Sequence, residues 1–437
     1  MWAKFAAALD AHVRGNSARA DKVASYLELA ATYGDRMGLP RKAVEVLQEA
    51  LTIESGPSKG PEPPAMVLGE QSSPAPHAIA GGDRRVTQEL LRRLRAAGQP
   101  EGAAQLIQQV LEKGERQTEL WRALAHVYRD MGRPGEARLA ASALVALGDA
   151  TREDLELIRV APPRPGRAAE GSFGHNEVAT LALQRAVELP ATALLASCGE
   201  AIAKIFPTDL ARFGLSRKDR LAPGNAHPLR ARIDQLCAIL NVECDAYEQA
   251  GAGPLVTVGL TDPASLIVSA RLGALPDAQQ VFLLSRALIA LSLGLHPALI
   301  FPTPDLERIL TAATRAVLSE FGGPNPQVED LARRIKKAQS RRWRNAQEVA
   351  AADYAAAPLA DVKSWQRAIA RTLNRAAAVL ADDLAAAMSG LALVTDAPTA
   401  ANSNGRPTPD DTGDLLRFWM SEPAQRVRAR SGLVAAQ

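Results

Sequence analysis

The sequence predicts a mostly helical protein in which an array of paired helices precedes a larger α+β domain with a small β-ribbon. Of its 437 residues, 47% are apolar, and many of these are alanine and leucine, which favour helices. Proline and glycine cluster in two stretches, 55–83 and 161–176, which indicates joins between folded parts. β-Branched residues concentrate in 255–269, where two short strands are predicted. A chain of this length forms two or three domains.

The overall charge argues against a general attraction to nucleic acid or to anionic membranes. Lys and Arg number 51 against 48 Asp and Glu, a formal net charge of +3.

The N-terminus lacks a charged segment followed by a long apolar one, so it does not resemble a secretory signal. The uncharged stretch 287–304 is interrupted by Pro297, as in a buried helix followed by a turn. We therefore expect a cytoplasmic protein without a membrane segment.

The cysteines do not suggest a disulfide framework. None forms a C-x-x-C pair, and an odd, sparse set fits a reducing compartment. We expect small buried apolar side chains at Cys198, Cys237 and Cys244.

A pattern of small and aromatic residues marks the segment 118–150 as a pair of helices. Ala125 and Ala137 stand where the two helices approach each other, because a larger side chain there would force them apart. Trp121 and Tyr128 are spaced to fill the groove beside them.

The same pattern recurs earlier in the chain. Ala103 lies 34 residues before Ala137, and Ala43 lies 60 residues before Ala103, in a segment with one extra residue in its turn. Sixty residues are one period plus an insertion of 26, which matches the Pro/Gly-rich stretch 55–83. The residues predicted to pack the repeats are Tyr26, Ala30, Tyr33, Ala43, Ala103, Trp121, Ala125, Tyr128 and Ala137.

These offsets resemble the tetratricopeptide repeat. The resemblance implies a helical solenoid over 1–54 and 84–160, separated by a disordered insertion at 55–83. Stacked repeats of this kind present a concave groove to peptides or helices. The expected groove residues are Glu28, Thr32, Arg122 and Arg129. The first helix resembles the second half of an earlier repeat, so either further repeats precede it, which we favour, or it serves as a cap.

After a linker at 161–176, the segment 177–394 resembles the gluzincin metallopeptidases related to prenyl-protein proteases. Paired helices lead to a short β-ribbon and then to a helix that reads roughly F-x-L-x-H-E-x-x-H in that family. Phe282 and Leu284 keep the apolar positions. The first zinc histidine, the catalytic glutamate and the second histidine of the family fall on Arg286, Ala287 and Ala290. The glutamate that supplies the third ligand falls near Arg371 and Arg375.

The resemblance implies a catalytically dead domain without metal or cofactor. Zinc needs two imidazoles at i and i+4, a third ligand and a carboxylate that activates water. The whole chain resembles the C-terminal part of long bacterial tetratricopeptide proteins that carry such a degenerate domain. No nucleophile-elbow, phosphate-loop or dinucleotide motif suggests another enzyme class. We expect a protein–protein interaction scaffold with protein or peptide partners; the alternative is a hydrolase with a rearranged metal site.

Charged groups offer further candidate sites. A basic run surrounds Trp343 and could bind the phosphate backbone of a nucleic acid, another anionic ligand or an acidic partner, although the helical spacing of Leu331 and Ile335 favours a solvated face. That run consists of Arg333, Arg334, Lys336, Lys337, Arg341, Arg342 and Arg344. Arg286, Arg371 and Arg375 could bind an anion or an acidic peptide in the former metal cavity; alternatively, they pair with Asp382 or Asp383 or point to solvent.

Three remaining features complete the sequence prediction. His296 is expected to interact with the last carbonyls of a helix rather than to ligate a metal. The polar stretch 395–411 is predicted to be a flexible loop, and 412–437 a C-terminal helix.

Overall fold

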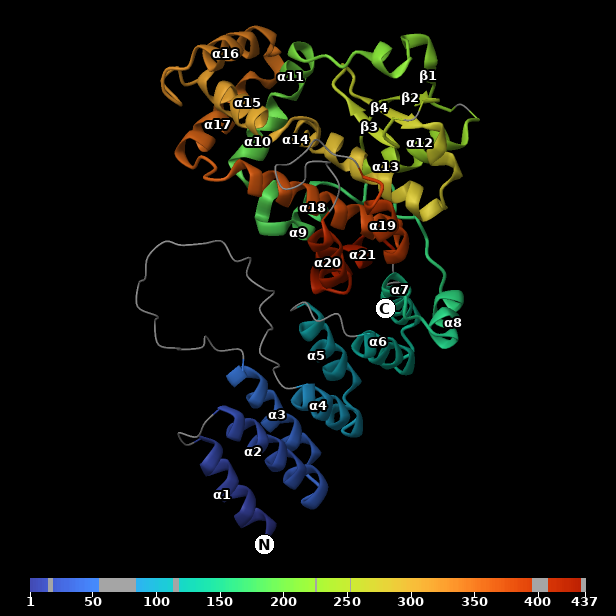
Figure 1. Cartoon of the computed structure of the whole chain (residues 1–437), viewed down its shortest axis with the longest axis vertical. Helices are drawn as coiled ribbons and strands as arrows, with labels where there is room; N and C mark the ends of the chain where they lie inside the picture. The colour runs from blue at the N-terminus through green and yellow to red at the C-terminus, as the bar shows by residue number, and fades with distance from the viewer. Residues whose placement is uncertain are drawn as a thin grey trace, which may run out of the picture. The chain divides into compact units, whose positions relative to one another are not determined.

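The computed structural model describes residues 1–14, 19–54, 84–112, 118–224, 226–251, 253–394 and 408–433. It divides into two compact units, Met1–Val110 and Leu111–Gln437. Most of the described residues are helical, and one small mixed sheet lies in the second unit (Figure 1), which confirms the mostly α prediction at that level. Among the described helices, none is long and apolar enough to span a bilayer. The predicted insertion at 55–83 and most of the predicted loop at 395–411 lie outside the described residues.

Helical hairpins form the first unit and begin the second. The first unit contains α1 (Trp2–Arg14), α2 (Arg19–Ala31), α3 (Pro40–Glu54), α4 (Arg84–Ala96) and most of α5 (Pro100–Glu112). The second unit opens with α6 (Thr118–Asp130) and α7 (Pro134–Leu147). Helix α2 packs on α3, and α6 packs on α7.

Three helix pairs share one kind of turn. Each turn has a glycine with positive φ, namely Gly38 (62°), Gly98 (64°) and Gly132 (71°). Two residues later a proline opens the second helix, where its fixed φ suits the first turn and its missing N–H is no loss; these prolines are Pro40, Pro100 and Pro134. The alanine three residues after each proline is fully buried; these are Ala43, Ala103 and Ala137.

The extra residue of the first hairpin lies in its first helix. The amide of Leu39 donates to the carbonyl of Tyr33, six residues back, at 2.8 Å. The equivalent bonds in the other two hairpins span five residues, from Gln99 to Leu94 and from Arg133 to Tyr128, both at 2.9 Å. The first hairpin accommodates the difference as a π-helical turn, Thr32–Arg36. The turn itself therefore keeps the same form in all three pairs.

The remainder of the second unit is a helical domain with a four-stranded sheet. Its helices are α8 (Arg152–Val160), α9 (His175–Leu181), α10 (Pro190–Ser197), α11 (Gly199–Ile205), α12 (Pro228–Leu240), α13 (Asp277–Ser292), α14 (His296–Ile300), α15 (Thr303–Arg315), α16 (Pro326–Ala338), α17 (Arg341–Ala356), α18 (Val362–Ala381), α19 (Leu384–Leu391), α20 (Pro409–Phe418) and α21 (Glu422–Arg430). Its strands are β1 (Arg220–Leu221), β2 (Asp245–Gln249), β3 (Val256–Gly259) and β4 (Ser265–Ser269).

The sheet is mixed and has the order β1-β2-β4-β3. The predicted ribbon is present as the antiparallel pair β3–β4. In addition, β2 pairs in parallel with β4, so that β4 is buried at every position in the middle of the sheet. Strand β3 lies at one end of this order and is therefore an edge strand.

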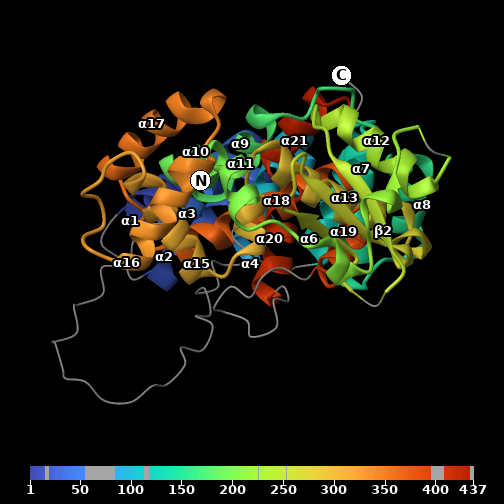
Figure 2. The ribbon, with the colours of Figure 1, turned by 90° about the horizontal axis from the view of Figure 1, so that it is seen from above.

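Helix α13 is the centre of the domain. It packs against β3 on one side and against α18 on the other, and Figures 1 and 2 both place it between the sheet and α18. Phe282 in its first half is fully buried, and a Cβ on Gly390 of α19 would lie 2.8 Å from the Phe282 ring. A helix that is apolar nearly all round is a buried core helix, and this one carries the sequence expected to correspond to the zinc helix.

The third hairpin is part of the second unit rather than of a separate array. Arg138 of α7 donates to a carboxylate oxygen of Asp382 at 2.7 Å, and both side chains are almost fully buried. The indole of Trp419 donates to the carbonyl of Leu139 at 2.8 Å. The segment predicted to be a linker, 161–176, is also packed, because Gly166 donates to the carbonyl of Leu380 at 2.9 Å.

Candidate binding cleft

A cavity of about 650 Å³ lies beside the edge strand β3. Its walls come from β3, from α13, from the segment that follows α11 and from the end of α14. The lining is largely apolar, with Phe206, Leu283 and Phe301 among its members. The rings of Phe206 and Phe301 meet edge to face with their centroids 5.3 Å apart. Such a lining suits apolar groups of a ligand.

The backbone of β3 faces the open side of the sheet at alternate residues. The amide of Ser269 donates to the carbonyl of Leu255, so these residues form a hydrogen-bonded antiparallel pair. Hydrogen-bonded and non-bonded pairs alternate along such a ladder. The amides and carbonyls of Val256 and Val258 therefore face away from β4, and within the described residues no strand pairs with them. Both residues line the cavity.

The backbone groups of Leu260, the next outward-facing residue after Val258, already form hydrogen bonds within the chain. The amide of Thr208 donates to the carbonyl of Leu260 at 2.9 Å, and the amide of Leu260 donates to the Thr208 hydroxyl at 2.7 Å. Thr208 thus takes the place of a further strand at this position, with its hydroxyl accepting where a strand would use its backbone carbonyl. The sequence analysis did not single out Thr208, because a contact over 52 residues has no local signal. Pro254, just before β3, was a signal for an edge strand, since proline is confined to such positions.

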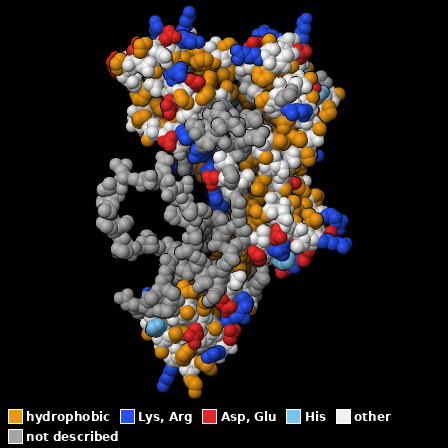
Figure 3. All heavy atoms as spheres, in the orientation of Figure 1, with side chains coloured by type: hydrophobic (Ala, Val, Ile, Leu, Met, Phe, Trp, Pro, Cys, Tyr) orange, Lys and Arg blue, Asp and Glu red, His pale blue; other side chains and the backbone are white. Residues whose placement is uncertain are grey.

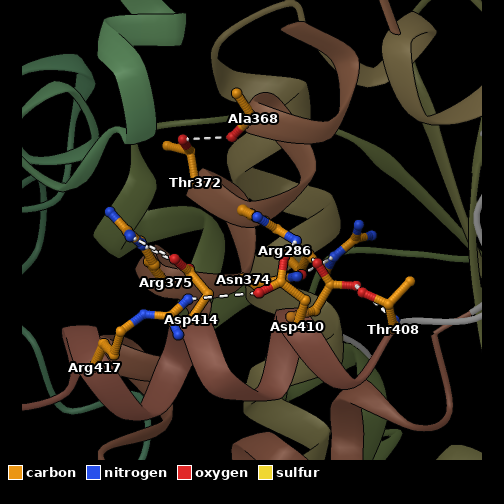
Figure 4. Close-up of polar contacts among 11 residues, drawn as sticks. Arg286, Ala368, Thr372, Asn374, Arg375, Thr408, Asp410, Asp414 and Arg417 are labelled. Carbon is orange, nitrogen blue, oxygen red and sulfur yellow. Dashed lines mark hydrogen bonds and ion pairs between the residues drawn. The ribbon is translucent and has the colours of Figure 1, made fainter. Parts of the chain in front are cut away.

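The positions that align with the zinc ligands and the catalytic glutamate of the resembling family are partly in the cleft. Arg286 and Ala287 line the cavity, whereas Ala290 is fully buried. Nε of Arg286 donates to Oδ1 of Asn374 on α18 at 2.7 Å (Figure 4). Within the described residues no group of three or more His, Cys, Asp or Glu side chains could hold a metal ion.

The other two arginines of the predicted anion site are committed elsewhere. Nη2 of Arg375 donates to Asp414 at 2.6 Å, and Nε of Arg371 donates to Asp411 at 2.7 Å. Figure 4 shows Arg375 directed toward Asp414 of α20 and Arg286 toward Asn374. A second hydrogen bond, which Nη2 of Arg371 donates to the carboxylate of Asp410, lowers the pKa of Asp410. The three arginines therefore do not gather as one positive site.

Their partners are also not the predicted ones. Asp382 pairs with Arg138, and Asp383 accepts the amide of Ala386 at the start of α19. The carboxylates that neutralise Arg371 and Arg375 come from α20, about forty residues further along the chain.

The residues predicted to pack the repeats are mostly in the hairpin cores. Tyr26, Ala30, Ala43, Ala103, Trp121, Ala125, Tyr128 and Ala137 are 3% exposed or less. Tyr33 is half-buried, and Nζ of Lys42 lies 5.8 Å from its ring centroid.

The residues expected to line a repeat groove differ in their surroundings. Glu28 is exposed, whereas Thr32 is buried and donates to the carbonyl of Glu28 at 2.9 Å. Arg122 pairs with Asp149 and Asp154 around the start of α8, and Arg129 pairs with Glu153 of the same helix. The third hairpin therefore presents these two arginines to α8, and the Arg129 side chain remains 42% exposed.

The predicted basic run is divided between two helices. Helix α16 ends at Ala338 and α17 begins at Arg341, while the intervening Gln339 is buried and donates to the carbonyl of Ser197 at 3.0 Å. Arg333 pairs with Asp330 on its own helix, and Arg334 lies over the Phe206 ring at 5.6 Å. Figure 3 shows basic, acidic and apolar side chains interspersed over α15–α17. The run therefore does not form a continuous stripe along one helix.

His296 is a buried neutral side chain. It opens α14, is 8% exposed and hydrogen-bonds to the backbone of Ala290 in the last turn of α13. Burial lowers its pKa to about 4. This is the predicted contact with the carbonyls at a helix end.

No protein-family model, no curated protein and no solved structure matches the chain.

Proposed function

We propose that the chain is a non-catalytic interaction protein in which hairpins of the tetratricopeptide type adjoin a degenerate peptidase-like domain, and that the cleft beside β3 binds an extended peptide. One observation carries the proposal: the outward-facing backbone groups of Val256 and Val258 open onto a cavity of about 650 Å³ with a largely apolar lining. A peptide that adds to a sheet edge gains backbone hydrogen bonds, and pockets for its alternate side chains give specificity.

The common turn supports the repeat interpretation. Three helix pairs have the same order of positive-φ glycine, helix-opening proline and fully buried alanine. Two of the prolines, Pro100 and Pro134, are 34 residues apart, which is the tetratricopeptide period. The exposed side chains of these hairpins offer a second surface to partners.

The pairing of α13 with α18 supports the peptidase-like interpretation. These are the two helices from which the resembling family takes its zinc ligands, and here they meet through Arg286 and Asn374 at 2.7 Å. A guanidinium remains protonated in proteins and has no lone pair to offer a metal. The cleft beside them is large enough for a peptide, so we infer that the domain retained peptide binding after it lost its catalytic residues.

A pair of variants at Val256 tests the proposal. Val256→Pro removes one N–H that faces the cleft and leaves the ladder to β4 intact, whereas Val256→Ala keeps that N–H and shortens the side chain. Peptides selected from a random display library on the full chain would be measured by fluorescence polarisation. We expect Val256→Pro to weaken binding about tenfold or more, equivalent to one lost hydrogen bond, and Val256→Ala to weaken it less, since the Val256 side chain is only half-buried.

Two results would overturn the proposal. One is a selection in which no peptide is enriched over a blank surface. The other is a set of peptides that bind wild type and Val256→Pro equally well, because they would occupy another surface, such as the hairpins. Circular dichroism of both variants checks that the fold is retained.

A further inference from the structure

Two cysteines of the second unit face each other although neither belongs to the cleft. Cys237 lies in the last turn of α12, and Cys244 directly precedes β2. Their Sγ atoms are 3.9 Å apart, and either thiol can donate to the other. Both side chains are half-buried, whereas Cys198 is fully buried. The prediction of small buried apolar side chains therefore describes Cys198 but not this pair.

The backbone on both sides of the pair is fixed by hydrogen bonds. The amides of Asn241 and Val242 donate to the carbonyl of Cys237, and Asn241 takes a left-handed conformation (φ 47°) that ends the helix. On the other side, the amide of Asp245 donates to the carbonyl of Ala264 at 3.0 Å. The two thiols are thus held together by secondary structure and not by a chance loop conformation. A disulfide needs the sulfur atoms about 2.05 Å apart, so the two Sγ atoms have to approach each other from 3.9 Å.

The surroundings of the pair favour a thiolate on Cys244. The hydrogen bond from Cys237 lowers the pKa of the Cys244 thiol, and the charge of Arg230 acts in the same direction, while burial, Asp245 and Asp234 act against it. Arg230 lies two turns before Cys237 on the same face of α12, and its Nη2 donates to Asp234 at 2.5 Å. Because the thiolate is the reacting form of cysteine, the first attack starts from Cys244.

We propose that Cys237 and Cys244 are a reversible disulfide site whose oxidant is a small disulfide such as oxidised glutathione. The Cys244 thiolate attacks one sulfur of oxidised glutathione, forms a mixed disulfide and releases one glutathione thiolate, which takes up a proton. Cys237 then loses its proton to solvent and attacks Sγ of Cys244, which releases the second glutathione. Two thiols are oxidised by two electrons, and one glutathione disulfide is reduced to two thiols. The bond closes a loop between α12 and β2.

Mass spectrometry of the native full chain tests this site. The protein is incubated in mixtures of reduced and oxidised glutathione, its free thiols are alkylated under denaturing conditions, and it is digested with trypsin. Both cysteines fall in one tryptic peptide, 233–271, while Cys198 falls in another, 186–204. We expect 233–271 to lose two hydrogens and both alkyl groups as oxidised glutathione increases, and reduced glutathione to reverse the change. Cys198 should remain alkylated throughout.

Single variants make the outcome decisive. In Cys237→Ser or Cys244→Ser the remaining cysteine should carry glutathione, since no second thiol can displace it. The proposal is overturned if wild type also accumulates glutathione on either cysteine, if both stay alkylated at every mixture, or if the disulfide forms only in denaturant. None of these outcomes depends on whether the cleft binds a peptide.

Discussion

At the scale of the residue, Gly34 is a position where one methyl group changes an ion pair. A Cβ on Gly34 would lie 1.9 Å from Nη1 of Arg93. Arg93 is 4% exposed and uses this space to place its two terminal nitrogens on the carboxylate of Asp35, at 2.6 and 2.5 Å. We expect Gly34→Ala to displace the guanidinium and to lower the free energy of unfolding by about 1–3 kcal/mol, measured by urea denaturation of the full chain.

The control for this prediction is the same change without the arginine. In an Arg93→Ala background, Gly34→Ala should be neutral or stabilising, since alanine favours helical backbone over glycine by up to about 1 kcal/mol. An equal cost in both backgrounds would mean that the arginine is not the cause.

His296 gives the stability of the domain a pH dependence. The ordinary histidine pKa of 6.5 applies to the unfolded chain, and burial lowers the pKa to about 4 in the folded one. Between these values the unfolded chain binds a proton that the folded chain does not, so stability is complete above pH 6.5 and falls as the pH falls toward 4. The loss amounts to roughly 3 kcal/mol at most.

A variant that cannot titrate isolates this effect. His296→Gln keeps a donor for the carbonyl of Ala290 but takes up no proton. Urea denaturation between neutral and acid pH should therefore show a smaller loss of stability for the variant than for wild type. Parallel curves for the two proteins would contradict the assignment.

At the scale of the element, α20 is held to α18 by charged pairs. Arg375 is 15% exposed and Asp414 is 6% exposed, so removing one partner leaves the other poorly solvated. We expect Asp414→Ala to increase hydrogen exchange of the amides of α20 by about tenfold or more. The double variant Arg375→Leu, Asp414→Leu should exchange more slowly than Asp414→Ala, because it leaves no unpaired charge. If the single variant exchanges like wild type, α20 is held by its apolar contacts.

The sequence predicted elements well where local chemistry determines them. The pair of helices over 118–150 and the strand pair β3–β4 have local signals, and both are present. Strand β2 was missed because its residues, Asp245–Gln249, have little intrinsic strand preference and depend on the pairing with β4.

The predicted C-terminal helix is two helices. They are separated at Ser421, after which Pro423 stands in the first turn of α21, where proline is tolerated. Proline inside the predicted helix was the available signal.

The candidate site was predicted only in part, for a similar reason. The alignment of α13 with a zinc helix placed Arg286 and Ala287, which do line the cleft. The partners of Arg371 and Arg375 could not be predicted, because Asp411 and Asp414 reach them across about forty residues of sequence. Contacts at that separation depend on the tertiary fold.

At the scale of the whole molecule, the third hairpin depends on the C-terminal elements. Helix α7 packs on α19, the carbonyl of Leu139 accepts the indole of Trp419, and Arg138 pairs with Asp382. A chain that ends after residue 160 would expose this face and leave Arg138 without its carboxylate. We expect the amides of α6 and α7 to lose protection from hydrogen exchange in that truncated chain. Full protection there would show that the hairpin is stable without the domain.

The short free edge of β3 also affects how copies of the chain behave toward one another. An open edge strand is a template on which identical chains can add without limit and form aggregates. Here Pro254 has no N–H and its carbonyl accepts from Gln249, while both backbone groups of Leu260 are bonded to Thr208. The unpaired backbone groups between these two positions, those of Val256 and Val258, can pair with a short segment of a ligand. They are too few for the long continuous pairing that fibre growth requires. The same two blocked ends that limit the length of a ligand thus protect the protein against self-association through this strand.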